Sequence, residues 1–211
     1  MVPSGPPARA SCRLGVALLA IGLAGCDVPN PDAATYLYIE DGSAGAMPDF
    51  GQFAADAANG GVHVFLEKTC GTLDCHGQVG RPFRLYSAGG LRDPDGGLDL
   101  CTSPQTEVPA GPMLPGSGPD TPKEICENYL SVVGLQPEDM QRVRVGEELP
   151  THLLIVSKPL TDWPGHKGGR KMTATGDPAT CLEDWLIGGV TVAGQAQMFD
   201  MGACQSADLL P

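Results

Sequence analysis

Two cysteines separated by four residues, Cys70 and Cys75, are followed directly by His76. A Cys-x-x-Cys-His segment attaches c-type haem, with both sulfurs bonded to the porphyrin and the histidine bound to the iron. The spacing here is two residues longer. The segment therefore predicts either a haem site whose longer loop bulges outward and still presents both sulfurs on one side of the ring, or a small disulfide loop beside an unrelated histidine.

The N-terminus has the pattern of a bacterial lipoprotein signal peptide. Arg9 and Arg13 precede a short apolar run, and Leu23-Ala24-Gly25-Cys26 follows that run. We expect residues 1–25 to be removed and Cys26 to be lipidated, since the apolar run is too short to span a bilayer. The expected location is the bacterial cell envelope, with the protein held to a membrane by its lipid and facing the periplasm or the cell surface. The choice between inner and outer membrane stays open.

The mature chain divides into a tether and one domain. Residues 26–45 are polar, contain several Pro and Gly, and lack a helical pattern, so they predict a flexible tether. Residues 46–211 are of a length for a single domain. The whole chain contains 29 Gly and 20 Pro, which indicates a loop-rich fold. A domain of this composition often needs covalent cross-links for stability.

The cysteine count allows for those cross-links. Of eight cysteines, Cys12 leaves with the signal peptide and Cys26 carries the lipid, so six remain. If Cys70 and Cys75 hold haem, the other four can form two disulfides. The simplest pairing joins Cys101 to Cys126 and Cys181 to Cys204.

The charge restricts the partners. The full chain has a formal net charge of −12, and both basic residues of residues 1–25 are lost on cleavage, which leaves 11 basic and 25 acidic side chains and a net charge of −14. So acidic a surface argues against binding to nucleic acid. It favours a partner protein with a cationic surface.

Helical periodicity begins at about Gly61 and runs into Cys70. In that helix Glu67 and Lys68 are expected to face solvent, and His63 to be an exposed or half-buried polar residue. A second helix is predicted from Thr121 to Gly134, because a Thr cap is followed by Pro and Glu. Three further segments have weaker patterns: a short helix begins at Gln136, residues 149–156 are strand or buried helix, and residues 181–189 form an amphipathic helix. The last twenty residues have no clear pattern.

Three blocks in order resemble the planctomycete-type and myxobacterial cytochrome c-like domains of secreted proteins and lipoproteins. The first is residues 64–77, where an apolar helix leads into Cys-His-Gly. The second combines residues 153–160 with Gly165-His166-Lys167-Gly168-Gly169, and is similar to the family's leucine-rich segment and its later His-x-Gly-Gly. The third combines Gly176-Asp177-Pro178 with residues 181–186, and is similar to the family's closing helix with its Trp. The resemblance covers roughly residues 60–190 in outline.

The resemblance implies an all-α, loop-rich, small cytochrome c-like helical domain that is stapled by disulfides. It implies covalent haem c on Cys70 and Cys75, with His76 as the proximal and His166 as the distal ligand of the iron. Met113, in the run Gly111-Pro112-Met113-Leu114-Pro115-Gly116, resembles a distal methionine and is the competing candidate. Another Met residue, or no distal ligand at all, is the remaining alternative. Arg81 or Arg84 is expected either to pair with a haem propionate or to be an ordinary surface charge.

The function that follows is single-electron transfer by a membrane-anchored c-type cytochrome, an electron carrier rather than a catalyst. His/His ligation implies a low-spin haem with a lower potential than His/Met ligation. The alternative is a haem-free binding or structural lipoprotein that keeps the fold and is stabilised by disulfides. A hydrolase is disfavoured, since the sequence contains no nucleophile elbow, HExxH motif or paired-carboxylate motif.

Overall fold

The computed structural model describes residues 47–93, 97–99, 101, 106–108, 118–162, 164–188, 191–192, 195–196 and 201–208. All of these belong to one compact unit, Ala33–Pro211, and a second unit, Met1–Asp32, lies outside the described residues. The predicted signal peptide, the lipidation residue Cys26, the tether and the alternative ligand Met113 also lie outside them.

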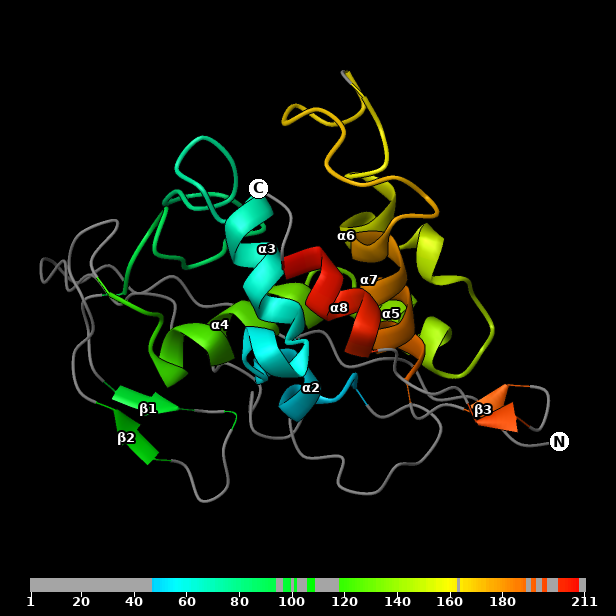
Figure 1. Ribbon diagram of the computed structural model, residues 1–211, viewed down its shortest axis with the longest axis horizontal. Helices are drawn as coiled ribbons and strands as arrows, with labels where there is room; N and C mark the ends of the chain where they lie inside the picture. The colour runs from blue at the N-terminus through cyan, green and yellow to red at the C-terminus, as the bar shows by residue number, and fades with distance from the viewer. Residues whose placement is uncertain are drawn as a thin grey trace, which may run out of the picture. The chain divides into compact units, whose positions relative to one another are not determined.

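Helices dominate the described residues (Figure 1), which confirms the helical, loop-rich fold class. Two short antiparallel ribbons accompany them, β1 with β2 and β3 with β4. The α-helices are α2 Phe50–Ala54, α3 Val62–Cys70, α4 Pro122–Val133, α5 Pro137–Arg144, α6 Leu154–Ser157, α7 Asp177–Ile187 and α8 Met201–Asp208; the 3-10 helices are η1 Ala57–Asn59 and η2 Pro150–His152; and the strands are β1 Gly97–Asp99, β2 Thr106–Val108, β3 Thr191–Val192 and β4 Gln195–Ala196.

Helix α4 begins as its sequence predicts. The Thr121 side chain accepts a hydrogen bond from the Glu124 backbone N–H, and the Glu124 carboxylate accepts one from the Thr121 N–H, which forms a capping box. The segment left open between strand and helix is helical, as η2 followed by α6. Helix α8 was not predicted. It packs on α7, and a disulfide between these two helices adds to that contact.

The core is centred on Trp185 of α7, which is fully buried against Phe53 of α2 and Tyr129 of α4. The polar atoms of both large rings are satisfied by the segment before α2. Trp185 Nε1–H donates to the Asp49 carbonyl at 2.9 Å, and the Tyr129 hydroxyl donates to the Pro48 carbonyl at 2.8 Å. Three helices distant in sequence are thereby fixed around one aromatic cluster.

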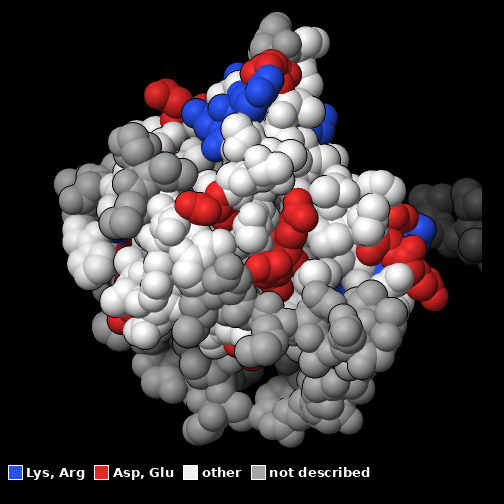
Figure 2. Space-filling model, turned by 45° about the vertical axis from the view of Figure 1, so that its right-hand side comes forward, with Lys and Arg blue, Asp and Glu red and all other residues white. Residues whose placement is uncertain are grey.

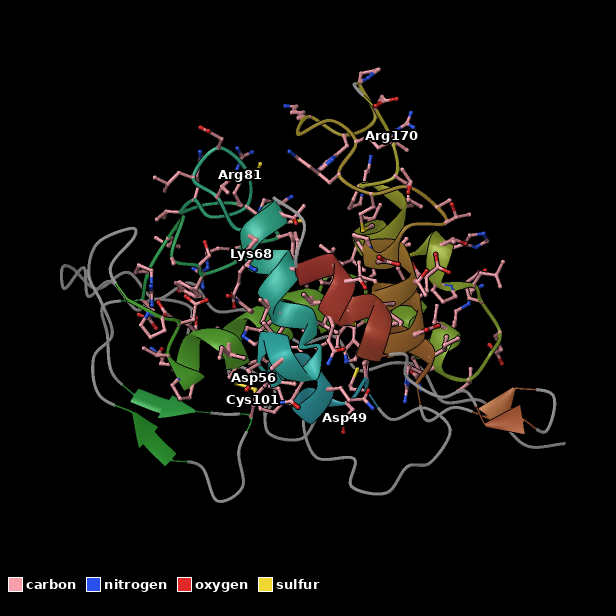
Figure 3. The ribbon with its side chains drawn as sticks, viewed as in Figure 1. Asp49, Asp56, Lys68, Arg81, Cys101 and Arg170 are labelled. Atoms are coloured by element: carbon pink, nitrogen blue, oxygen red, sulfur yellow. A yellow bond between two sulfur atoms is a disulfide. The ribbon has the colours of Figure 1, made fainter. Side chains whose placement is uncertain are left out.

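Two disulfides staple the unit, in the pairing that the cysteine count suggested. Cys101 is bonded to Cys126 of α4, and Cys181 of α7 to Cys204 of α8. The first fastens Cys101, which follows β1, to α4, and Cys101 is labelled in Figure 3. The second joins the short helix α8 to α7.

The chain between α3 and β1 is anchored to α4 by buried polar groups. The Arg92 guanidinium forms two hydrogen bonds with the Glu124 carboxylate, at 2.9 and 2.7 Å, and neither side chain is exposed. The Asn128 amide bonds to both the N–H and the carbonyl of Tyr86. These contacts fix the path of residues 85–93 against α4, and with it the position of the segment that begins at Cys70.

Two polar residues of α3 differ from their expected placement. His63 is buried, and its Nδ1 donates to the Phe53 carbonyl at 2.8 Å. The Glu67 side chain, expected in solvent, is largely enclosed, and the Asn128 amide donates to it at 3.3 Å. Both predictions were wrong because α2 and α4 cover the polar side of α3, which a pattern local to the helix does not reveal. Within the described residues, no helix is both long enough and apolar enough to cross a membrane.

Candidate functional site

A cavity of about 500 Å³ lies between two loops at one end of the unit. The cysteine loop, residues 71–84, follows α3, and the histidine loop, residues 158–172, joins α6 to α7. Figure 3 labels Arg81 on the first loop and Arg170 on the second. The lining is mainly apolar in area and brings together Cys70, Asp74, Cys75, His76, Arg81, Phe83, Leu135, Leu154, Ile155, Lys158, Pro159, Pro164, Gly165, His166, Lys167 and Gly168.

The extra residues between the cysteines are taken up by tight turns. The Cys75 N–H donates to the Thr72 carbonyl, and the His76 N–H donates to the Cys70 carbonyl, both at 2.9 Å. Although six positions separate them in sequence, Cys70 and His76 are therefore joined directly by a backbone hydrogen bond. Cys70, Cys75 and His76 all line the same cavity despite the expanded spacing.

Three glycines allow the chain to cross itself beneath this loop. A Cβ on Gly77 or on Gly90 would stand 1.9 Å from the Gly71 carbonyl oxygen. That oxygen also accepts a hydrogen bond from the Ser87 hydroxyl at 2.6 Å. The glycine after His76 is thus required by a close backbone crossing rather than by a turn conformation.

The His76 ring is oriented by the backbone of its own loop. Its Nδ1 lies 2.9 Å from the Phe83 carbonyl oxygen, which can only accept, so Nδ1 carries the proton and Nε2 keeps a lone pair. Burial lowers the pKa of His76, and the nearby His166 and Arg81 lower it further against the opposing effect of the Phe83 carbonyl. The neutral imidazole with a bare Nε2 is the form that binds a metal ion.

His166 has the same arrangement on the opposite loop. Its Nδ1 donates to the Gly169 carbonyl at 2.7 Å, which again leaves Nε2 as the free nitrogen. Gly169 has a φ of +70°, a conformation that favours glycine. A Cβ on Gly168 would lie 3.2 Å from Cε1 and 3.6 Å from Nε2 of the ring, so this glycine keeps that side of the imidazole uncovered.

The histidine loop is closed on itself. The N–H groups of Lys171 and Met172 both donate to the Pro159 carbonyl, at 2.8 and 3.1 Å. Met172 is buried in the core, and the Lys158 ammonium donates to the Gly165 carbonyl at 3.1 Å. A loop whose ends meet and whose interior is hydrogen-bonded is a compact Ω-loop, which presents His166 from a defined base.

The two histidine rings face one another across the cavity. Their centroids are 6.3 Å apart and their planes differ by 11°. Two imidazoles bound on opposite sides of one metal ion, each with a nitrogen–metal bond of about 2.0–2.1 Å, would have centroids about 6.4 Å apart. The observed centroid separation is close to that value, and the two rings are stacked with nearly parallel planes.

The two thiols at the cavity are not bonded to each other. Cys70 is buried and Cys75 half-buried, and both are free. Burial raises the pKa of the Cys70 thiol to about 12, with smaller and opposing effects of Cys75 and Lys171. Cys70 is therefore protonated at neutral pH, and its S–H is available to a ligand that enters the cavity.

The two arginines proposed as propionate partners have different surroundings. Arg81 lines the cavity and is exposed. Arg84 instead pairs with Glu127 at 3.4 Å and lies over the Tyr86 ring, 4.6 Å from its centroid. Arg81 is accordingly the one positioned to meet an anionic group at the cavity.

Several lining residues were not identified from the sequence. Phe83 packs against His76 with ring centroids 4.7 Å apart, and Leu154, Ile155 and Lys158 form part of the wall. Leu154 and Ile155 were visible only as part of the apolar run at residues 153–156, and Phe83 lies in a segment without a clear pattern. These residues matter because an apolar wall with a few converging polar groups is typical of a cofactor pocket.

The donors do not suit a bare metal ion. Across the residues that the structure describes, no group of three or more His, Cys, Asp or Glu side chains is arranged to hold one. A structural zinc site needs four such ligands around a point. The features of this cavity that bear on a bound cofactor are its apolar lining and the two stacked imidazoles.

Comparison with protein-family models, with curated proteins and with solved structures found no match for this chain. The function is therefore argued from the site itself.

Proposed function

We propose that this protein is a c-type cytochrome that carries single electrons in the bacterial cell envelope, held to a membrane by a lipid on Cys26. Haem would be attached through Cys70 and Cys75, with His76 as the proximal and His166 as the distal ligand. When bound, haem supplies an iron that accepts and releases one electron. The chain's own contribution is to hold two imidazoles through their Nδ1 hydrogen bonds, to offer two thiols and to provide an apolar cavity wall.

One observation carries the proposal: two parallel imidazoles with ring centroids 6.3 Å apart share a cavity with two free thiols. Each imidazole is held by a backbone carbonyl at Nδ1, which leaves Nε2 as the nitrogen available for a ligand bond. Occupation of both axial positions by histidine favours electron transfer over the binding of small gases. Arg81 and Lys167 at the cavity would offset the charge of the propionates.

The test is to produce the full chain together with haem-maturation machinery and to record a pyridine haemochrome spectrum. We expect about one covalently bound haem per chain, which persists on a denaturing gel. A purified, folded protein without covalent haem would contradict the proposal.

The ligands are tested by single substitutions. His166→Ala should keep the covalent haem and lose the low-spin spectrum, whereas His166→Met should keep low-spin ligation and raise the reduction potential. Cys70→Ser combined with Cys75→Ser should abolish covalent attachment. His152→Ala is the matched control, because His152 is an exposed imidazole that pairs with Glu148 and does not line the cavity. An unchanged low-spin spectrum in His166→Ala would remove His166 from the site.

The competing proposal is a haem-free lipoprotein of the same fold. The observation in its favour is that the unit has an aromatic core and two disulfides, neither of which involves Cys70 or Cys75. Mass mapping of the non-reduced, mature protein separates the two. A Cys70–Cys75 disulfide would support the haem-free form, and thioether-linked haem would exclude it.

A further inference from the structure

The positive charge of this acidic protein is concentrated around its cavity. Five exposed basic residues lie on the two loops that border it, and we call them the basic rim: Arg81, Lys158, Lys167, Arg170 and Lys171. Residues 158–172 alone contain four basic side chains and one acidic side chain, in a chain whose net charge is −12. Figure 2 shows Lys and Arg gathered at the top of the molecule, with few of them elsewhere on that face.

The basic residues outside the rim are largely committed to the fold. Arg92 and Lys123 form ion pairs with Glu124 and Asp93, and Arg144 donates to the Leu186 and Gly188 carbonyls at 2.8 Å. Within the rim, only Arg170 pairs with a carboxylate, that of Asp162. Asp74 is the other acidic side chain at the cavity. The local charge at this end is therefore positive and opposite in sign to the total.

Apolar side chains are exposed beside the same cavity. Leu154 lines it with 39% of its surface exposed, and Leu73 and Val79, on the cysteine loop, are 46% and 79% exposed. Small apolar spots within a charged border are typical of transient protein interfaces, where charge steers the encounter and the apolar spots make the contact.

We propose that the basic rim is the docking surface for an acidic partner protein that exchanges electrons with this one. The inference rests on the proposed function, because electrons enter or leave where the cavity opens to solvent. The net charge of the chain predicts a partner with a cationic surface, whereas the basic rim predicts a partner with an acidic surface. The rate of encounter depends on the electric field at the contact site. Salt screens charges that lie farther from that site than about one Debye length, so the nearby basic rim contributes more to this field than distant acidic residues do.

Two small oxidants of opposite charge test the sign of that field. The reduced protein gives one electron to hexacyanoferrate(III), which becomes hexacyanoferrate(II), or to hexaammineruthenium(III), which becomes hexaammineruthenium(II). If the rim controls access, raising the salt from about 100 mM to about 1 M, which shortens the Debye length from about 10 to about 3 Å, should slow oxidation by the anion several-fold and should not slow oxidation by the cation. If net charge controls access, added salt should accelerate oxidation by the anion and slow oxidation by the cation. That result would overturn the proposal.

Matched variants locate the effect. Lys167→Gln and Lys171→Gln each remove one charge from the rim, and Arg142→Gln removes one from the exposed surface of α5, away from the cavity. At low salt each rim variant should react with hexacyanoferrate(III) about two- to threefold more slowly, and Arg142→Gln should match the wild type. The double variant Lys167→Glu/Lys171→Glu should reverse the salt dependence. Equal effects of all three single variants would refute a localised surface.

A binding measurement keeps the proposal testable whether or not the protein carries haem. Fluorescein-labelled deca-glutamate should bind the full mature chain at low salt, as seen by anisotropy, and should be released at high salt. Lys167→Glu/Lys171→Glu should abolish this binding and Arg142→Gln should retain it. No binding of deca-glutamate would overturn the docking surface even if haem is present. Binding to vesicles containing anionic phospholipid, without binding to deca-glutamate, would instead assign the rim to the bilayer.

Discussion

Glu67 is an acid enclosed by groups that disfavour its charge. Burial raises its pKa well above the usual range, and the neighbouring Asp120 carboxyl raises it further. The remaining contacts are weak in comparison: the Asn128 amide donates to it at 3.3 Å, and His63 Nε2 lies 4.0 Å away. Glu67 therefore stays protonated in the folded protein at neutral pH, whereas in the unfolded chain it ionises above about pH 4.3.

This difference makes stability fall as the pH rises. Above the unfolded pKa the folded state holds a proton that the unfolded state has lost, so each further pH unit costs up to about 1.4 kcal/mol. We predict that Glu67→Gln, which cannot ionise, raises the free energy of unfolding at pH 8 by about 1 kcal/mol or more and changes it little at pH 4. Urea unfolding at the two pH values measures this. Glu138→Gln, on the exposed side of α5, should leave the difference between the two pH values as in the wild type.

At the scale of the elements, the sequence predicted the features that depend on residues close together in the chain. The helix α4 was predictable because Thr121, Pro122 and Glu124 build its start from within the helix itself. The cavity-lining residues Cys70, Cys75 and His76 were recognisable as a candidate site from one short segment. Helix α8 was not predictable, because its position depends on a disulfide to α7 and on burial of Ala203 and Ala207 against distant residues. The enclosure of Glu67 and the closed shape of the histidine loop likewise arise from contacts between elements.

The crossing beneath the cysteine loop gives a prediction at this scale. Gly77→Ala would drive a Cβ to 1.9 Å from the Gly71 carbonyl oxygen, and the backbone of both segments must then move. We expect a loss of about 2–4 kcal/mol in the free energy of unfolding, together with a lower yield of covalent haem, because His76 precedes the displaced residue. Gly89→Ala is the control, since its nearest atom, on Thr72, is 4.0 Å from the added Cβ. Equal stability of the two variants would show that the crossing is not required.

At the scale of the whole molecule, the two disulfides hold segments that the core alone secures poorly. They close the chain over sequence separations of 25 and 23 residues. We predict that Cys181→Ala/Cys204→Ala lowers the free energy of unfolding by about 3 kcal/mol, because the cross-link restricts the unfolded chain. Both sulfurs are fully buried, so a cavity is added to that loss. Denaturant unfolding measures the change, and an unaltered midpoint would contradict it.

The burial of Cys70 protects the covalent structure of the folded domain. Two unbonded thiols share this molecule with two disulfides, and a thiolate that attacks either disulfide would exchange one cross-link for another. With a thiol pKa of about 12, only about one Cys70 side chain in 10⁵ is a thiolate at neutral pH, compared with a few per cent for an ordinary cysteine. Disulfide exchange that starts from the Cys70 thiolate is therefore slow once the chain has folded.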